Sequence, residues 1–201
     1  MEDPENSETN KILCEERKKV MKKLIAMMLV LTMVFVFVAC GEEAAPAANG
    51  GDEITGEVYD AGNVQVLVPG GWKAFGVSDI FGEDGAMDPD AVQICKGGET
   101  ELDLWSKPYI QINYYGADTD MMQPSKDFYD NAEDIDPMTI GSHTWNGFTC
   151  ESLGAKIAIL WAEDGDHQYQ ASVYLEAGDE TISLTDADVQ AILESVTPSA
   201  A

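Results

Sequence analysis

The sequence predicts an α+β domain whose mostly antiparallel β-sheet is flanked by helices, preceded by one separate hydrophobic helix. Six or more short segments alternate apolar and polar residues between turn residues, which indicates strands joined in hairpins. Two other segments repeat apolar residues at spacings of three and four, which indicates amphipathic helices. Residues 54–198, about 145 in number, suit one domain with a single core.

The predicted strands are bounded by clear stop signals. The first two cover residues 56–59 and 64–68, and Pro69 ends the second. Further strands are expected at residues 91–96, 110–115, 148–153, 156–162 and 168–176. Residues 156–162 are almost continuously apolar, which suits a central strand covered on both faces.

Two turns are predicted from their composition. Asn146-Gly147 is the strongest short hairpin signal in the chain. Residues 143–145 and 148–153 are therefore expected to pair as neighbouring strands. Residues 163–166, with the sequence Glu-Asp-Gly-Asp, are expected to turn the chain into its last long strand.

A short helix is predicted after Pro124. Ser125 is expected to cap it, and Phe128, Ala132 and Ile135 follow at spacings of four and three.

A second helix is predicted near residue 186, with Thr185 as its cap and Asp188 as the capping-box partner. Leu184 is expected to pack onto Val189, and Pro198 ends the segment. The apolar stripe of this helix consists of Val189, Ile192, Leu193 and Val196.

Three of these segments resemble the PsbP-like group of proteins. They are residues 64–72 (VQVLVPGGW), the 141–148 hairpin and the 186–196 helix. The group includes photosystem extrinsic subunits and many bacterial lipoproteins. The resemblance implies an α/β/α sandwich around an antiparallel sheet, with a binding or accessory role, and it supplies no catalytic residue.

The segment 21–39 has the features of an export signal. Lysines and an arginine precede an uncharged run of 16 residues, 24–39, that ends in alanine. As a helix this run spans about 24 Å, less than the ~30 Å hydrocarbon layer of a membrane. A short uncleaved anchor is the alternative interpretation.

Residues 37–40, Phe-Val-Ala-Cys, resemble the lipobox of bacterial lipoproteins. This resemblance implies that the Cys40 thiol receives diacylglycerol, that acyl chains such as palmitate anchor the protein, and that Cys40 becomes the new N-terminus. Phe37 replaces the leucine usual in that motif. Two acyl chains give stable membrane anchoring.

The residues on either side of this signal have simpler roles. Residues 1–20 are expected to be a non-native extension, because Met21 is a natural signal-peptide start and Cys14 then has no role. Residues 40–53 comprise the lipidated cysteine and a flexible tether rich in glycine, alanine and proline.

The formal net charge is −26, and the acidic and basic residues before Cys40 cancel. The rest of the chain therefore carries the whole negative charge. Nucleic acid is excluded as a partner, because binding it requires basic surface. The same charge keeps a tethered domain soluble and away from an anionic membrane surface.

Cys95 and Cys150 lie in predicted strands. They form either a disulfide, which an extracytoplasmic location permits, or two buried thiols that act as small apolar residues. Two cysteines and two distant histidines do not make a zinc pattern.

An acidic stretch at residues 78–90 is a candidate calcium site. Its carboxylates are Asp79, Glu83, Asp84, Asp88 and Asp90. Calcium takes six to eight oxygen ligands, but the stretch lacks the alternating acidic residues of an EF-hand. A solvated loop is the alternative, and no other cofactor is expected.

Aromatic residues form a second candidate site. Trp105, Tyr109 and Trp145, with Tyr114 and Tyr115, are candidates for a binding surface. Packing at the edge of the sheet is the alternative.

No hydrolase motif surrounds His143 or His167, and no catalytic residue is assigned. The sequence therefore predicts a non-enzymatic binding or accessory lipoprotein on the outer face of the bacterial cell membrane, with an unidentified protein or small-molecule partner. A calcium-dependent surface module and a cell-envelope hydrolase are the alternatives.

Overall fold

The computed structural model describes residues 54–82, 85–116, 119, 121, 123–152 and 154–200. The predicted extension 1–20, signal peptide 21–39, lipidated Cys40 and tether 41–53 lie outside the described residues. Within the described ranges, no helix has both the length and the apolar character that crossing a membrane requires.

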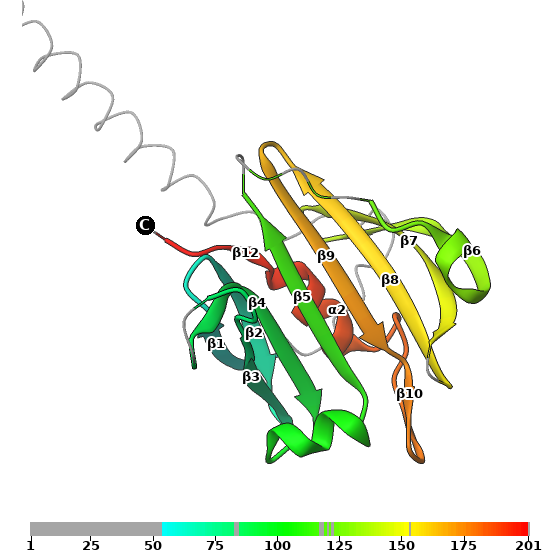
Figure 1. Ribbon diagram of the computed structural model, residues 1–201, viewed down its shortest axis with the longest axis horizontal. Helices are drawn as coiled ribbons and strands as arrows, with labels where there is room; N and C mark the ends of the chain where they lie inside the picture. The colour runs from blue at the N-terminus through cyan, green and yellow to red at the C-terminus, as the bar shows by residue number, and fades with distance from the viewer. Residues whose placement is uncertain are drawn as a thin grey trace, which may run out of the picture. The chain divides into compact units, whose positions relative to one another are not determined.

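The main element is a seven-stranded antiparallel sheet with the order β3-β4-β5-β9-β8-β7-β6 (Figure 1). Its strands are β3 (Trp72–Ser78), β4 (Met87–Lys96), β5 (Tyr109–Tyr115), β6 (Asp130–Ile140), β7 (His143–Ser152), β8 (Ala155–Asp164) and β9 (His167–Tyr174). Strands β6 to β9 follow one another as a meander, and β5 then pairs with β9.

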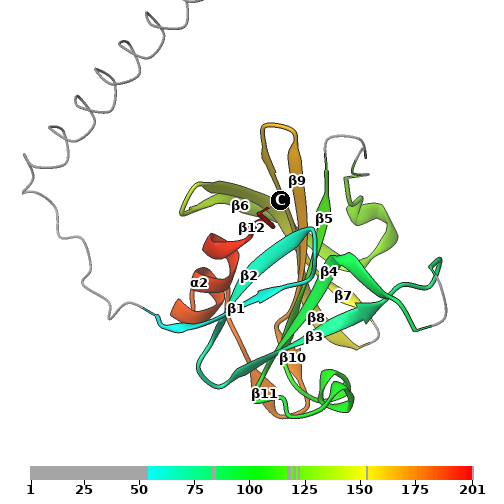
Figure 2. The same cartoon turned by 90° about the vertical axis from the view of Figure 1, so that its left-hand side faces the viewer.

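A smaller layer covers one face of this sheet. It consists of the three-stranded sheet β1-β2-β12 and the helix α2 (Ala187–Ser195), where the strands are β1 (Gly56–Asp60), β2 (Val64–Pro69) and β12 (Thr197–Pro198). Figure 2 shows β1, β2 and α2 together on one side of the large sheet. The remaining elements are the hairpin β10 (Glu176–Ala177) and β11 (Glu180–Thr181) and the 3-10 turns η1 (Glu101–Trp105) and η2 (Lys126–Phe128).

The hydrophobic core lies between the two layers. Its fully buried members include Val64, Val66, Ile94, Ile112, Leu160, Tyr169, Val189, Ile192 and Leu193. The strand members alternate along their strands with less buried residues, as a sheet covered on one face requires. Each fully buried aliphatic side chain contributes about 1.5–3 kcal/mol to stability. The predicted apolar stripe of α2 is confirmed by this packing.

Hydrogen bonds fix α2 against the two strands β2 and β3. The Leu67 amide donates to Ser195 Oγ at 2.8 Å, and Trp72 Nε1 donates to Asp188 Oδ2 at 3.2 Å. The N-cap residue is Asp186, one position after the predicted Thr185, and its carboxylate accepts from the Ser183 amide.

The predicted α/β/α sandwich is wrong. Among the described residues α2 is the single α-helix, and no helix covers the other face of the large sheet. The antiparallel sheet was predicted correctly, but the fold is β-rich and its second helical layer is missing. The PsbP-like resemblance implied helices on both faces of the sheet, whereas in the described residues α2 lies on one face only.

The helix predicted after Ser125 is instead η2 followed by the edge strand β6. The register of β6 against β7 shifts twice, between Asp130 and Glu133 and between Ile135 and Met138. Each shift inserts extra residues, so that the less exposed positions of β6 recur every third residue. This spacing imitates a helix in the sequence.

The hairpin predicted at Asn146-Gly147 is also wrong, because both residues lie inside β7. The turn comes earlier, at Gly141, whose φ of 59° suits glycine. Gly147 is needed for a different reason: a Cβ there would lie 2.3 Å from the carbonyl oxygen of Ile159 on β8. The residue marks a close approach of two strands.

Candidate ligand-binding site

The large sheet has a face turned away from α2, which we call the open face. Directly paired residues of antiparallel strands share a face, so the strand registers identify its members. One row across β4, β5, β9, β8 and β7 consists of Cys95, Tyr109, Tyr174, Ile157 and Cys150. The next row consists of Gln93, Gln111, Ser172, Ile159 and Phe148.

The two halves of the open face differ in chemistry. On β7 and β8 a small buried apolar cluster is covered in part by Tyr129 and Ala132. On β4, β5 and β9 the face is polar and half-buried instead. We call these residues the polar strip: Gln93, Gln111, Asn113, Gln170 and Ser172. All five are uncharged, in a chain whose formal charge is −26.

Hydrogen bonds align the amides of the polar strip. Gln93 Nε2 donates to Gln111 Oε1 at 3.0 Å, and Gln111 Nε2 donates to Asn113 Oδ1 at 3.2 Å. Each amide nitrogen carries two hydrogens, so one remains on each for another acceptor. The strip therefore presents oriented donors and acceptors without a net charge.

Two stacked tyrosines border the polar strip. The rings of Tyr109 and Tyr174 have centroids 4.0 Å apart and planes 15° from parallel. Burial, together with the adjoining Tyr174, raises the pKa of the Tyr109 hydroxyl well above its ordinary value. Tyr109 therefore stays neutral and keeps a donor hydrogen throughout the physiological pH range.

The loop that carries Trp105 is held in place by its own hydrogen bonds. Asp103 Oδ2 accepts from the amides of Thr100 and Glu99 at 2.8 and 2.9 Å. These bonds lower the pKa of the Asp103 carboxyl, and the Thr100 bond is the larger cause. The carboxylate thus orders the turn η1, which ends at Trp105.

Two lysines attach the same loop to the sheet. Lys73 on β3 donates to the Glu99 carbonyl at 2.6 Å, and Lys107 donates to the Gly97 carbonyl. On the other side, the loop packs against the β10–β11 hairpin, where a Cβ at Gly178 would lie 2.8 Å from the Ser106 carbonyl oxygen. Trp105 therefore lies on a loop that is held in place from both sides, yet 85% of the residue's surface is exposed.

Trp105 separates two depressions that share Leu104, Trp105 and Tyr109 in their walls. The smaller, of about 320 Å³, extends past Gln93 toward β3. The larger, of about 580 Å³, extends past Tyr174 toward the β10–β11 hairpin. We call the two together the aromatic groove. Its charged members are Glu101 on the first side and Glu176 on the second.

The predicted aromatic surface is thus present only in part. Trp105 and Tyr109 lie together in the groove, whereas Trp145 is fully buried in the core. Tyr114 packs against that core, and Tyr115 lines a separate depression of about 420 Å³. The sequence did not single out Tyr174 or the polar strip, since their position depends on the pairing of β9 with β5 and β8.

Cys95 and Cys150 do not form the disulfide that was one of two predicted alternatives. Both are buried free thiols. They lie in one row of the sheet, but β5, β9 and β8 separate their strands. Four strand spacings of about 4.8 Å place the two cysteines far beyond disulfide reach. Burial raises the pKa of both thiols.

Three of the five carboxylates of the acidic stretch, the candidate calcium site, lie within the described residues. Asp79 accepts hydrogen bonds from the amides of Phe81 and Gly82, while Asp88 and Asp90 line the 420 Å³ depression together with Asn63. Glu83 and Asp84 lie outside the described residues. Within the described ranges, no three acidic, histidine or cysteine side chains are grouped closely enough to hold a metal ion.

Neither histidine belongs to the aromatic groove. His143 is buried, and its Nε2 donates to the Val196 carbonyl at 2.8 Å. His167 Nδ1 lies 2.7 Å from the Tyr114 hydroxyl. Both imidazoles make structural contacts to neighbouring elements.

Comparisons with known proteins identify no family. No family model matches the chain, and no curated protein matches it. Among solved structures, the chain is similar to a protein from Bacteroides thetaiotaomicron VPI-5482, whose crystal structure was determined at 1.50 Å resolution. The TM-score is 0.39 and the identity 11%, over 72% of this chain. The chain matches about half, 49%, of the length of that protein.

Proposed function

We propose that this protein is a lipoprotein, anchored through Cys40 to the outer face of a bacterial cell membrane, that binds a ligand in its aromatic groove without catalysing a reaction. The anchor is supported by the basic, apolar and Ala-Cys pattern of residues 21–40. The tether that follows gives the domain reach above the membrane.

The observation that carries the binding role is the position of Trp105. An indole that is 85% exposed offers a partner a large apolar surface, and Leu104 and Tyr109 adjoin it in the walls of both depressions. Phe128 is similarly exposed but lines neither depression. The indole stands between the two depressions on a loop fixed by Asp103, Lys73 and Lys107. A fixed loop loses little conformational entropy when a ligand binds.

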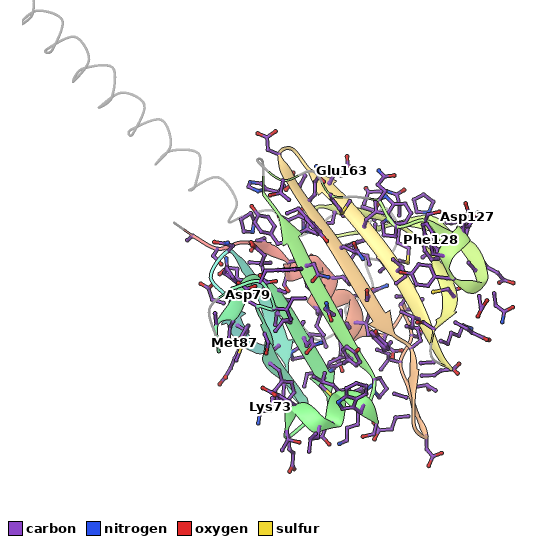
Figure 3. The ribbon with its side chains drawn as sticks, viewed as in Figure 1. Lys73, Asp79, Met87, Asp127, Phe128 and Glu163 are labelled. Carbon is purple, nitrogen blue, oxygen red and sulfur yellow. The ribbon has the colours of Figure 1, made fainter. Side chains whose placement is uncertain are left out.

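Site-specific photo-crosslinking in intact cells tests the binding role. A photoreactive phenylalanine analogue replaces Trp105 in one variant and Phe128 in another. Phe128 is a matched control, because it is 86% exposed. It also lies at the opposite edge of the sheet from Lys73, whose ammonium donates a hydrogen bond to the Trp105 loop (Figure 3). Irradiation is expected to yield a discrete envelope adduct at position 105 and none at position 128. Equal labelling at both positions, or none at 105, contradicts the proposal.

The anchor is tested separately through Cys40. Cys40→Ser is expected to abolish labelling by a fatty-acid analogue and to leave an unprocessed precursor. Cys95→Ser and Cys150→Ser serve as controls, because both thiols are buried in the domain. Labelling that persists in Cys40→Ser would rule out this attachment point.

A further inference from the structure

We infer that the aromatic groove, whose binding role is the function proposed above, takes a neutral oligosaccharide chain. The inference rests on the juxtaposition of three features on the open face. They are the exposed Trp105, the stacked pair Tyr109 and Tyr174, and the uncharged polar strip.

The aromatic residues match the apolar part of a sugar. A pyranose ring presents C–H groups on its flat faces, and these pack against an aromatic ring through burial and weak C–H contacts. Trp105 offers one such ring between the two depressions. Tyr109 and Tyr174 offer a second, half-buried aromatic surface beside it.

The polar strip matches the rim of a sugar. Sugar hydroxyls both donate and accept hydrogen bonds, and side-chain amides do the same from one planar group. Gln93 lies in the wall of the smaller depression, and its bond to Gln111 continues the strip along the sheet. A ligand with many hydroxyls can use such a surface, whereas a purely apolar ligand would leave these amides unpaired.

Charge narrows the choice of ligand. The chain carries 37 acidic residues, yet none of the five residues of the polar strip is acidic. A cationic ligand therefore pairs only with Glu101 and Glu176 of the groove, and the amides of the strip add no charge to hold it. An anionic ligand meets Glu101 and Glu176 on the two sides of Trp105 and the repulsion of the whole chain. A neutral ligand avoids this repulsion and matches the uncharged amides of the strip.

The form of the groove favours a chain over a single sugar. The two depressions, of about 320 and 580 Å³, lie on opposite sides of the Trp105 indole, which forms part of the wall of each. Volumes of this order are typical of small-molecule sites. Consecutive sugar rings on both sides of Trp105 would fill both depressions, which one ring would leave half-empty.

Calorimetric titration of the full-length lipoprotein in a detergent without a sugar head group tests the inference. The neutral probes are cellohexaose, maltohexaose and fully N-acetylated chitohexaose, and the anionic probe is hexagalacturonic acid. At least one neutral probe is expected to bind, and the anionic probe is expected not to. Trp105→Ala should weaken the binding at least about tenfold, and Gln93→Leu about fivefold or more, since both residues line the groove. Phe128→Ala is the control and should leave the affinity unchanged.

Trp105 is on the surface, so its replacement is expected to leave the melting temperature unchanged, and that measurement accompanies the titration. If none of the neutral hexasaccharides binds, the sugar inference is overturned. A crosslink that still forms at position 105 would in that case support the binding role of the groove on its own. Equal binding of hexagalacturonic acid overturns the neutral preference. Full affinity in Trp105→Ala overturns the assignment of sugar binding to this groove.

Discussion

The rings of Tyr109 and Tyr174 stack across β5 and β9 with their centroids 4.0 Å apart. The two residues are directly paired in the sheet and lie on its open face. The same row includes Cys95 on one side of the pair and Cys150 on the other. The pair therefore joins the floor of the aromatic groove to the buried centre of the sheet.

Removing one ring of this pair is expected to reduce stability. Tyr174→Ala should lower the free energy of unfolding by about 2–4 kcal/mol, from lost burial and lost stacking together. Urea denaturation measures the change. Ser172→Ala is the matched control on the same strand and face, where a loss below about 1 kcal/mol is expected for a half-buried hydroxyl. Equal losses in the two variants would mean that stacking contributes nothing.

Gly147, the glycine of β7, should not tolerate a larger side chain. Gly147→Ala places a methyl group 2.3 Å from the Ile159 carbonyl oxygen, so the strands must separate or shift. A loss of about 3 kcal/mol is expected, at the upper end for overpacking. Gly70→Ala, where nothing lies within 4 Å of the added carbon, should change stability by less than about 0.5 kcal/mol. Comparable melting temperatures for the two variants would contradict the close approach.

The Trp105 loop should weaken in acid because of Asp103. Hydrogen bonds from Thr100 and Glu99 hold the folded-state pKa of this carboxyl below 3.8. Since the folded value is lowered, its stabilisation is complete above the unfolded pKa and disappears as the pH falls through the folded value. The melting-temperature difference between wild type and Asp103→Asn should therefore be largest above pH 4 and vanish toward pH 2. A difference that stays the same from about pH 7 to about pH 2 would contradict this role of Asp103.

The two domain thiols should resist modification in the native state. Cys95 and Cys150 are buried and free, and burial raises the pKa of each, so little thiolate is available at neutral pH. Iodoacetamide treatment followed by peptide mapping is expected to label neither cysteine before unfolding and both afterwards. A linked peptide containing both residues under non-reducing conditions would contradict the separation of β4 and β7.

Calcium should have little effect on the fold. Of the predicted carboxylates, Asp88 and Asp90 line the same depression, while Asp79 bonds its own loop. Among the described residues of this stretch, two neighbouring carboxylates fall short of the six to eight oxygens that calcium prefers. Addition of about 1 mM calcium is expected to shift the melting temperature by less than about 1 °C. A rise that grows with calcium concentration and is lost in Asp90→Asn would contradict this.

Regular alternation made much of the sheet predictable. Ile110 and Ile112 on β5, like Val64 and Val66 on β2, are buried where the period of two placed them. The stripe of α2 was equally clear. Trp105 could be singled out because it falls between a Gly-Gly turn and a strand, where a large apolar residue has no core to enter.

Other features of the fold depend on which strands pair, and the sequence of a single segment does not reveal its partner strand. The two register shifts in β6 produced a spacing of three, which a helix also produces. Gly147 serves a close approach between strands but has the local sequence of a turn. Trp145 then appeared to border that turn, whereas it lies within β7 on the core face. Tyr174 joins Tyr109 only when β9 pairs with β5.

The pairing of β12 with β2 determines the order in which parts of the chain can fold. Thr197 lies opposite Gln65, and their side chains are linked by a 3.2 Å hydrogen bond across 132 positions of sequence. The meander β6–β9 can form from neighbouring segments, but the three-stranded sheet closes only after residue 198 has been synthesised. Contacts of such long range slow the final step of folding. A polypeptide that stops before α2 would leave Val64 and Val66 without their cover and exposed to proteases and to aggregation.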